Sequence, residues 1–497
     1  MTILKPALRV GILVILALIL ALITQSRGLA GAEVDALSGG GLVVDALFSE
    51  KGSLSERLGE GFKVDPEHPR AETYPKRHPW RLDFAVSPLS RWTSACAIML
   101  APEGVDDRLA ARLMAAFLMI LAAFWIMSLF EARAGLSAAL ASLASSAALD
   151  AAGGAGSGAI SALAMVAFIA STLGMLKRRS SAVWVGLSWG LLLATHPGAL
   201  FLLIPLFVAV AIAWKGEHKQ PALDQETTLA LPTVPPLLMA VPLIGVALLV
   251  AIWPSLWSHS GRGIAQWLTD TWWAMAPQQQ ILGEQSIQAQ SKAPQAFIAS
   301  LQWLAWTPWP LLVAWFAGLM MTIRAGRKGL WLPPLLLATI LIIGGIDGGL
   351  FGARHSLMPW LWVCTAMSAG LGLAPLGRYL GPAIVGVCLI SSALMSPWGI
   401  SSLGPEARAP VPERALWEIA EREPGARVHI ASALDGQRFG VQTLRWRSGL
   451  DITWSEPEEA TWLLILGEEP APKAWKGEES PTYDDRLSGL RLRAFKR

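Results

Sequence analysis

Residues 186–205 read GLSWGLLLATHPGALFLLIP, and this stretch predicts how the chain is built. Apolar residues extend over 182–195 and 197–214, and only the polar break Thr195-His196 separates the two runs. A membrane-crossing helix needs roughly 20 mostly apolar residues. The stretch therefore predicts two consecutive spanning helices that meet at a short polar turn, as in a protein that crosses the membrane many times.

The composition of the 497-residue chain agrees with a membrane protein. The chain is 53% hydrophobic and 15% charged, whereas a soluble domain carries about 25% charged residues. Residues 26–90 and 400–497 have the polarity of water-soluble protein, and most of 91–399 is apolar. The net charge of +3 is too small to indicate a nucleic-acid partner, and the three cysteines match no metal or redox motif.

Hydropathy predicts about eleven spanning helices and one shorter apolar helix, over 89–101, that lies at the membrane interface. With a cytoplasmic N-terminus, every short basic loop falls on the cytoplasmic side and the C-terminus lies outside. If 89–101 crossed the membrane, the distribution of basic residues downstream would reverse. The predicted spans are 9–25, 109–130, 135–149, 158–176, 182–195, 197–214, 230–252, 302–323, 331–346, 356–375 and 379–397.

A set of ionisable residues converges on the outer side of the membrane in this assignment. Ionisable side chains at membrane depth are costly and usually functional. Tryptophans near the ends of apolar runs are predicted to mark one membrane face, because the indole ring favours the headgroup region. These tryptophans are Trp253, Trp257, Trp272, Trp273, Trp303, Trp306 and Trp309. The outward polar groups comprise the loop 26–88, Asp150, Thr195-His196, the loop 253–300, Asp347, Arg354-His355 and residues 398–497.

The C-terminal segment is predicted to be a small α/β domain. A helix is expected over 412–422, because proline suits the first helical turn, and strands are expected over 427–432, 461–466 and 490–495. The segment carries no recognisable catalytic, metal or nucleotide motif. A structural or substrate-gating role is therefore favoured for it.

The succession of motifs resembles the glycosyltransferase C superfamily, in particular its protein-mannosyltransferase and aminoarabinose-transferase-like branch. An acidic motif follows the first span, although here Val34 separates Glu33 from Asp35 and no tyrosine follows. Residues 186–205 form the closest local match, with Thr195-His196 where family members usually have Thr-Lys. The other matching stretches are Ser87–Trp92 or alternatively His78–Trp80, Arg108-Leu109 or Arg112-Leu113, Asp150, Trp253–Trp257 with Gly261-Arg262, Thr307–Leu311, and Asp347-Gly348 with Arg354-His355 and Pro359.

The resemblance implies an all-α polytopic membrane enzyme that moves a sugar from a polyprenyl-phosphate carrier to an acceptor on the outer face. The spanning domain would cover 1–400, with an outer loop and interfacial helices over 26–108, and a periplasmic α/β domain would cover 401–497. Glu33 or Asp35 would act as general base on the acceptor hydroxyl. The substrate-binding candidates are Asp150, His196, Arg262, Arg354 and His355. No cofactor is required, although a divalent metal is compatible with the sequence.

Each candidate also has an ordinary structural explanation. The acids of the first loop are compatible with plain solvated residues, Asp150 with a helix N-cap, and Arg354 with an interfacial anchor. His196 could satisfy a local backbone group before Pro197, and Arg262 is the weakest of the set. Residues 1–32 also fit a cleavable signal peptide, and we favour an uncleaved first helix because the family resemblance requires one.

Two other functions remain open from the sequence. The chain could be a catalytically inactive subunit of an envelope assembly, since the acidic motif is altered. It could also be a transporter, although it shows no internal repeat of the kind common in transporters. Its short loops and richness in Ala, Leu and Gly favour a bacterial inner membrane, and the expected partners are the lipid-linked sugar, membrane lipid and an acceptor lipid, protein or polysaccharide.

Overall fold

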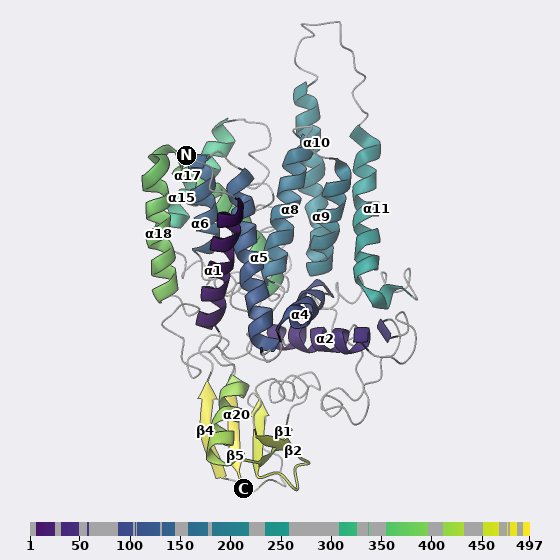
Figure 1. Cartoon of the computed structure of the whole chain (residues 1–497), viewed down its shortest axis with the longest axis vertical. Coiled ribbons are helices and arrows are strands. Elements are labelled where there is room, and N and C mark those ends of the chain that lie inside the picture. The colour runs from purple at the N-terminus through teal and green to yellow at the C-terminus, as the bar shows by residue number, and fades with distance from the viewer. Residues whose placement is uncertain are drawn as a thin grey trace, which may run out of the picture.

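The computed structural model describes most of the apolar body of the chain and the C-terminal sheet (Figure 1). The described residues are 6–24, 31–48, 57–58, 88–102, 105, 107–129, 132–144, 158–176, 181–217, 234–257, 308–325, 336, 354–395, 411–431, 451–466, 475, 478–484 and 491–497.

Ten of the described helices form a bundle whose axes run roughly along the longest dimension of the molecule (Figure 1). The predicted spans 158–176 and 182–195 coincide with helices, whereas the helix expected over 302–323 begins at Trp309. The turn Pro197–Leu202 is a 3₁₀ helix, η2, that leads into the next helix. The ten helices are α1 (Pro6–Thr24), α5 (Asp107–Leu129), α6 (Ala132–Leu143), α8 (Gly158–Leu176), α9 (Ala182–Thr195), α10 (Leu203–Glu217), α11 (Val234–Ile252), α15 (Trp309–Ala325), α17 (Arg354–Leu373) and α18 (Gly377–Met395).

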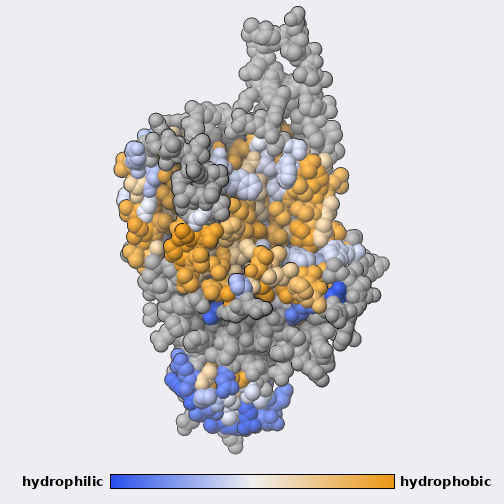
Figure 2. All heavy atoms as spheres, viewed as in Figure 1, coloured by the Kyte–Doolittle hydropathy of each residue, from blue (hydrophilic) through white to orange (hydrophobic). Residues whose placement is uncertain are grey.

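The outer side of the bundle is apolar. Figure 2 shows hydrophobic residues over the bundle and hydrophilic residues over the region of the C-terminal sheet. Among the described helices, α5 and α8 are long and apolar enough to cross a membrane, and seven shorter apolar helices accompany them. Large exposed apolar side chains are typical of a surface that faces lipid rather than water. They include Ile15, Ile204, Leu243, Val313, Phe316, Val387 and Ile390.

Aromatic side chains lie at the ends of several helices. Trp184 and Tyr379 are exposed in the first turns of α9 and α18, and Trp309 is exposed at the start of α15. This placement is typical of side chains at the headgroup level. The predicted interfacial role of Trp253 is wrong, because this side chain is only 2% exposed and belongs to the buried cluster of the bundle. Trp272, Trp273, Trp303 and Trp306 lie outside the described residues.

Glycines allow the helices of the bundle to approach closely. A Cβ atom on Gly190 of α9 would lie 2.7 Å from the carbonyl oxygen of Gly245 on α11. The side chain of Trp189 packs over Gly245 and donates a hydrogen bond from Nε1 to the Ala199 carbonyl, at 2.7 Å. Small residues at helix contacts are the usual way in which membrane helices pack together.

Two helices lie at one end of the bundle, between it and the C-terminal sheet (Figure 1). They are α2 (Gly31–Phe48), which runs across the bundle axis, and α4 (Pro88–Leu100), which packs against it. The segment predicted to be an interfacial helix thus forms α4. Trp92 of α4 donates a hydrogen bond from Nε1 to the carbonyl of Ile252, at 2.7 Å, so α4 is attached to the last turn of α11.

The C-terminal segment forms a five-stranded sheet with the order β2-β1-β3-β5-β4. β1 is parallel to β2 and β3, whereas β5 is antiparallel to β3 and β4. The predicted helix and three strands are present within about one residue, and β2 and β4 were not predicted. The elements are α20 (Val411–Arg422), β1 (Ala426–Ala431), β2 (Ile452–Trp454), β3 (Trp462–Leu466), β4 (Glu478–Asp484) and β5 (Arg491–Lys496).

Helix α20 covers one face of this sheet. Its Leu416 and Ile419 are buried with Val428 and Trp462, in a cluster that continues without a break to Leu37, Ala97 and Ala110 on α2, α4 and α5. The apolar core of the C-terminal segment is therefore continuous with the helices at this end of the bundle. Strand residues on the other face, Leu463, Ile465 and Phe495, form a second cluster.

Glu423 ties the end of α20 to two strands of the sheet. Its carboxylate accepts a hydrogen bond from Trp462 Nε1 at 3.1 Å and lies 3.2 Å from Lys496 Nζ. The Lys496 ammonium also lies 5.4 Å from the centre of the Trp462 ring. Burial works to raise the pKa of Glu423, but the hydrogen bonds from Trp462 and Lys496 outweigh it and leave that pKa below its ordinary value.

Candidate functional site

The sequence candidates that the structure describes lie at the end of the bundle that carries α2 and α4. Ser161, in the first turn of α8, donates a hydrogen bond to Thr195 at the end of α9, at 3.4 Å. The His196 ring lies edge-on to that of Trp360 on α17, with 5.9 Å between ring centres. The end of α9 and the beginnings of α8 and α17 are therefore neighbours, and α4 packs against α8 and α9.

Glu33 and Asp35 lie in the first two turns of α2. The sequence placed them in an outer loop with interfacial helices, and the structure places them in a helix that begins at Gly31. Acidic residues near a helix N-terminus are favoured, because the unpaired amide groups give that end a partial positive charge. Helix α2 thus fixes the backbone of both acids at the end of the bundle where the other candidates lie.

His196 occupies a defined position between two helices. It ends α9 and caps η2, where its Nδ1 accepts a hydrogen bond from the Gly198 amide at 2.9 Å. Its expected structural role, the satisfaction of a local backbone group, is therefore confirmed. Because Nδ1 is the acceptor, the neutral ring carries its proton on Nε2. The side chain is 7% exposed, so that Nε2–H group is a donor in a largely buried setting.

Arg354 and His355 are the first two residues of α17. Trp360, less than two helical turns further on, contacts His196, so the start of α17 lies close to the end of α9. The structure thereby brings His196 near the Arg354-His355 pair, although these residues are about 160 positions apart in the chain. Asp150, Arg262 and Asp347 lie outside the described residues.

Two buried arginines were not among the site candidates, although both lie in stretches that carry the sequence resemblance. Arg91 on α4 and Arg112 on α5 are each 1% exposed. A charged residue inside an otherwise apolar helix is costly and usually functional, and this was the available signal for Arg91. The sequence cannot show that the residue is buried, because its burial depends on contact with α2, which is distant in the chain.

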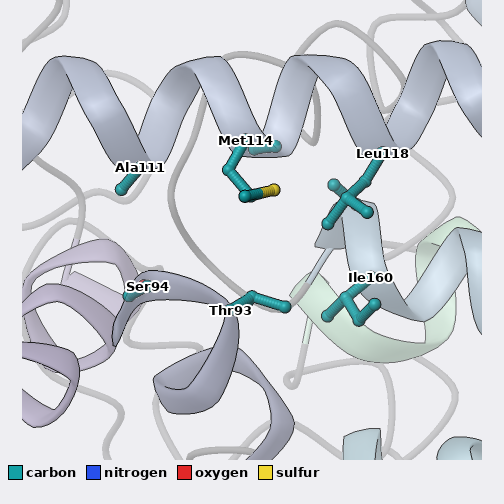
Figure 3. Close-up of a pocket in the computed structure, with 8 residues that line it drawn as sticks. Thr93, Ser94, Ala111, Met114, Leu118 and Ile160 are labelled. Carbon is teal, nitrogen blue, oxygen red and sulfur yellow. The ribbon is translucent and has the colours of Figure 1, made fainter. Parts of the chain in front are cut away.

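A small groove lies between α4, α5 and α8 (Figure 3). Its empty volume is about 210 Å³, including space open to the surroundings. Thr93 lines the groove, but its hydroxyl already donates to the carbonyls of Leu89 and Ser90. Met114, Leu118 and Ile160 supply apolar walls. Polar and apolar residues therefore line the groove together.

No cluster of three His, Cys, Asp or Glu side chains that could hold a metal ion occurs within the described part of the chain.

Comparison with known proteins identifies the fold through solved structures. No protein-family model and no curated protein matches the sequence. The structure of ArnT from Cupriavidus metallidurans bound to undecaprenyl phosphate is similar over 98% of this chain and 97% of that protein, with a TM-score of 0.54 and 12% sequence identity. The apo structure of ArnT gives a TM-score of 0.52 at 13% identity over the same shares of the two chains. The chain therefore has the fold of ArnT, which is the glycosyltransferase C fold that the sequence motifs predicted.

Proposed function

We propose that this protein is a membrane glycosyltransferase that moves a sugar from a polyprenyl-phosphate carrier to an acceptor on the outer face of the membrane. The observation that carries the proposal is the shared fold, which extends over nearly the full length of both chains. ArnT was crystallised with undecaprenyl phosphate, a polyprenyl-phosphate lipid. The same class of carrier is therefore the donor we infer for this chain.

The proposed reaction requires a base at the acceptor and donors at the leaving group. A carboxylate of α2, from Glu33 or Asp35, takes the proton of the acceptor hydroxyl, whose oxygen forms the new bond to the anomeric carbon. The bond from that carbon to the carrier phosphate breaks, and the phosphate leaves with the electron pair. Negative charge grows on the phosphate oxygens as the bond breaks, so N–H donors placed there lower the barrier.

The candidate residues have the chemistry for the leaving group. Arg354 and Arg262 carry a guanidinium fork that matches phosphate oxygens, and His355 can add a further donor. His196 offers its Nε2–H group, because Nδ1 is already occupied by the Gly198 amide. Asp150 is assigned to orienting the acceptor or a basic partner. The carrier's isoprenoid chain needs only apolar walls.

The proposed topology follows from the same arrangement. Basic loops put the N-terminus in the cytoplasm, so the end of the bundle with α2, α4 and the sheet faces the periplasm of a bacterial inner membrane. The spanning domain covers 1–400 and the periplasmic domain 401–497. The continuous apolar cluster between α20 and α2 supports a C-terminal domain that is seated beside the reaction site.

Carrier release by the purified protein tests this function. The protein in lipid is given a panel of radiolabelled polyprenyl-phosphate sugars with crude membrane acceptors, and Glu33→Gln and Asp35→Asn are compared with wild type. Asp45→Asn is the matched control, since Asp45 is a half-buried acid of the same helix, beyond the glycines. Loss of release in one of the first two variants alone supports the transferase. Absence of release from wild type with every donor favours the inactive-subunit or transport functions.

A further inference from the structure

Arg91 is a deeply buried charge that lies next to α2. It lies in the first turns of α4 and is 1% exposed. Removing a guanidinium from water without compensation costs several kcal/mol, on the order of the stability of a whole domain. A buried arginine is therefore expected to have an acidic or strongly polar partner nearby.

Glycines of α2 create the space in which the Arg91 side chain lies. A Cβ atom on Gly39 would lie 2.7 Å from Arg91 Cδ and 3.0 Å from its Nε, closer than side-chain atoms pack. On the next residue, Gly40, it would lie 2.7 Å from Ser94 Cβ and 2.9 Å from the Ala95 amide nitrogen. The arginine stem thus lies directly against the α2 backbone at position 39.

Helical spacing from position 39 shows which acids of α2 share its face. Position 39 meets Arg91, and position 40 meets residues 94 and 95. Position 45 follows position 39 by six residues and points about 120° away from it around the helix. Asp45 therefore lies on a different face of α2 from the one along which Arg91 lies.

Helical spacing then separates the two candidate acids. Position 35 precedes position 39 by four residues and lies within about 40° of it around the helix, one turn away. Position 33 precedes it by six residues and points about 120° away. The backbone of α2 therefore places residue 35, and not residue 33, on the face along which Arg91 lies.

We propose that Arg91 is the charge partner of the Asp35 carboxylate and its positioning residue, which makes Asp35 rather than Glu33 the general base. This inference deepens the transferase function proposed above and rests on it for the role of the acid. A guanidinium attracts a carboxylate and can donate charge-assisted hydrogen bonds to it. One oxygen would be fixed in direction and the acid kept ionised, ready to accept the acceptor's proton.

Other charged groups lie on the elements packed against α4, and the test must separate them from Arg91. Within the described residues, α2 also carries Glu33 and Asp45, and α9 leads to His196. The first two turns of α5 carry Asp107, Arg108 and Arg112. Arg112 has the same 1% exposure as Arg91, so Arg112→Gln is the matched control for loss of a buried guanidinium.

A double-mutant cycle measured by thermal unfolding tests the pairing without any enzymatic activity. Arg91→Gln, Asp35→Asn and the double variant are compared in one detergent. If the two charges are partners, the fall in Tm of the double variant is clearly smaller than the sum of the two single effects. Strictly additive falls overturn the pairing, and the cycle of Arg112→Gln with Asp35→Asn sets the additive baseline.

The pH dependence of turnover tests the role of the acid. A positive neighbour favours the carboxylate form, so loss of Arg91 lets the base become protonated at higher pH. The acid limb of the kcat profile is expected to move up by about one pH unit or more in Arg91→Gln. In Arg91→Lys, which keeps the positive charge, the limb should stay close to its wild-type position. An unmoved limb, or loss of turnover in Glu33→Gln but not in Asp35→Asn, overturns the assignment. An inactive wild type refutes the transferase instead, and the unfolding cycle still decides the pairing.

Discussion

Truncation of Leu416 to alanine tests whether the buried cluster under α20 holds the C-terminal sheet together. Leu416 is fully buried and packs in the cluster with Val428, Trp462 and Leu464. The change removes three carbon atoms, each buried methylene contributes about 0.8 kcal/mol, and the cavity adds to the loss. We expect a destabilisation of about 2–4 kcal/mol.

Hydrogen exchange of the β3 amides measures this destabilisation. The protein is kept in detergent under conditions in which it remains folded. A loss of about 2–4 kcal/mol corresponds to exchange roughly 30- to 1000-fold faster. The amides of α8 serve as the internal reference, since α8 belongs to another cluster. Leu416→Met keeps the volume and should cost less than about 1.5 kcal/mol. Unchanged β3 exchange in Leu416→Ala, or equal acceleration in α8, would refute the reasoning.

Three further changes have expected outcomes. Trp189→Phe removes the hydrogen bond to the turn after His196, so Tm should fall by an amount equivalent to about 1–3 kcal/mol, while Trp184→Phe, at an exposed position, should leave Tm nearly unchanged. Gly190→Ala should lower Tm and the yield of folded protein because of its close contact with α11, and Gly386→Ala, which has open space around the new methyl group, should be neutral or slightly stabilising. Glu423 has a lowered pKa in the folded protein, so the stability it contributes is present above its unfolded pKa and lost as pH falls through the folded value. The Tm difference between wild type and Glu423→Gln should therefore shrink as pH falls from 7 towards 3, and a difference independent of pH would contradict this origin.

Helices in long apolar runs could be predicted well, because the apolar run itself identifies the helix without knowledge of what it packs against. The limits of α8 and α9 follow from where charge interrupts the hydrophobic sequence, and β1, β3 and β5 follow from alternation in a polar segment. The position of His196 at a helix boundary follows from the proline after it. These features depend on neighbouring residues alone.

Other features depend on contacts between distant segments. Helix α2 contains three consecutive glycines, which are poor helix formers, and it is helical where α4 packs onto those glycines. Strand β4 could not be predicted because it contains a proline, which argues against a strand, and pairs with an irregular register. Strand β2 is only three residues long, which is too short to show an alternating pattern. The burial of Arg91 and the contact between His196 and Trp360 likewise join segments that only the folded chain brings together.

The cluster that joins α20 to α2 has a consequence for the order in which the protein matures. Leu37 leaves the ribosome long before its cluster partners Leu416, Trp462 and Ala494, because several hundred residues separate them in the chain. Domains form as the chain emerges, so the bundle can assemble early while this cluster stays incomplete until residue 494 has been made. Helix α2 therefore reaches its final environment only after the C-terminal sheet has been synthesised. A chain that stops short of residue 410 would leave an apolar surface open beside the two acids.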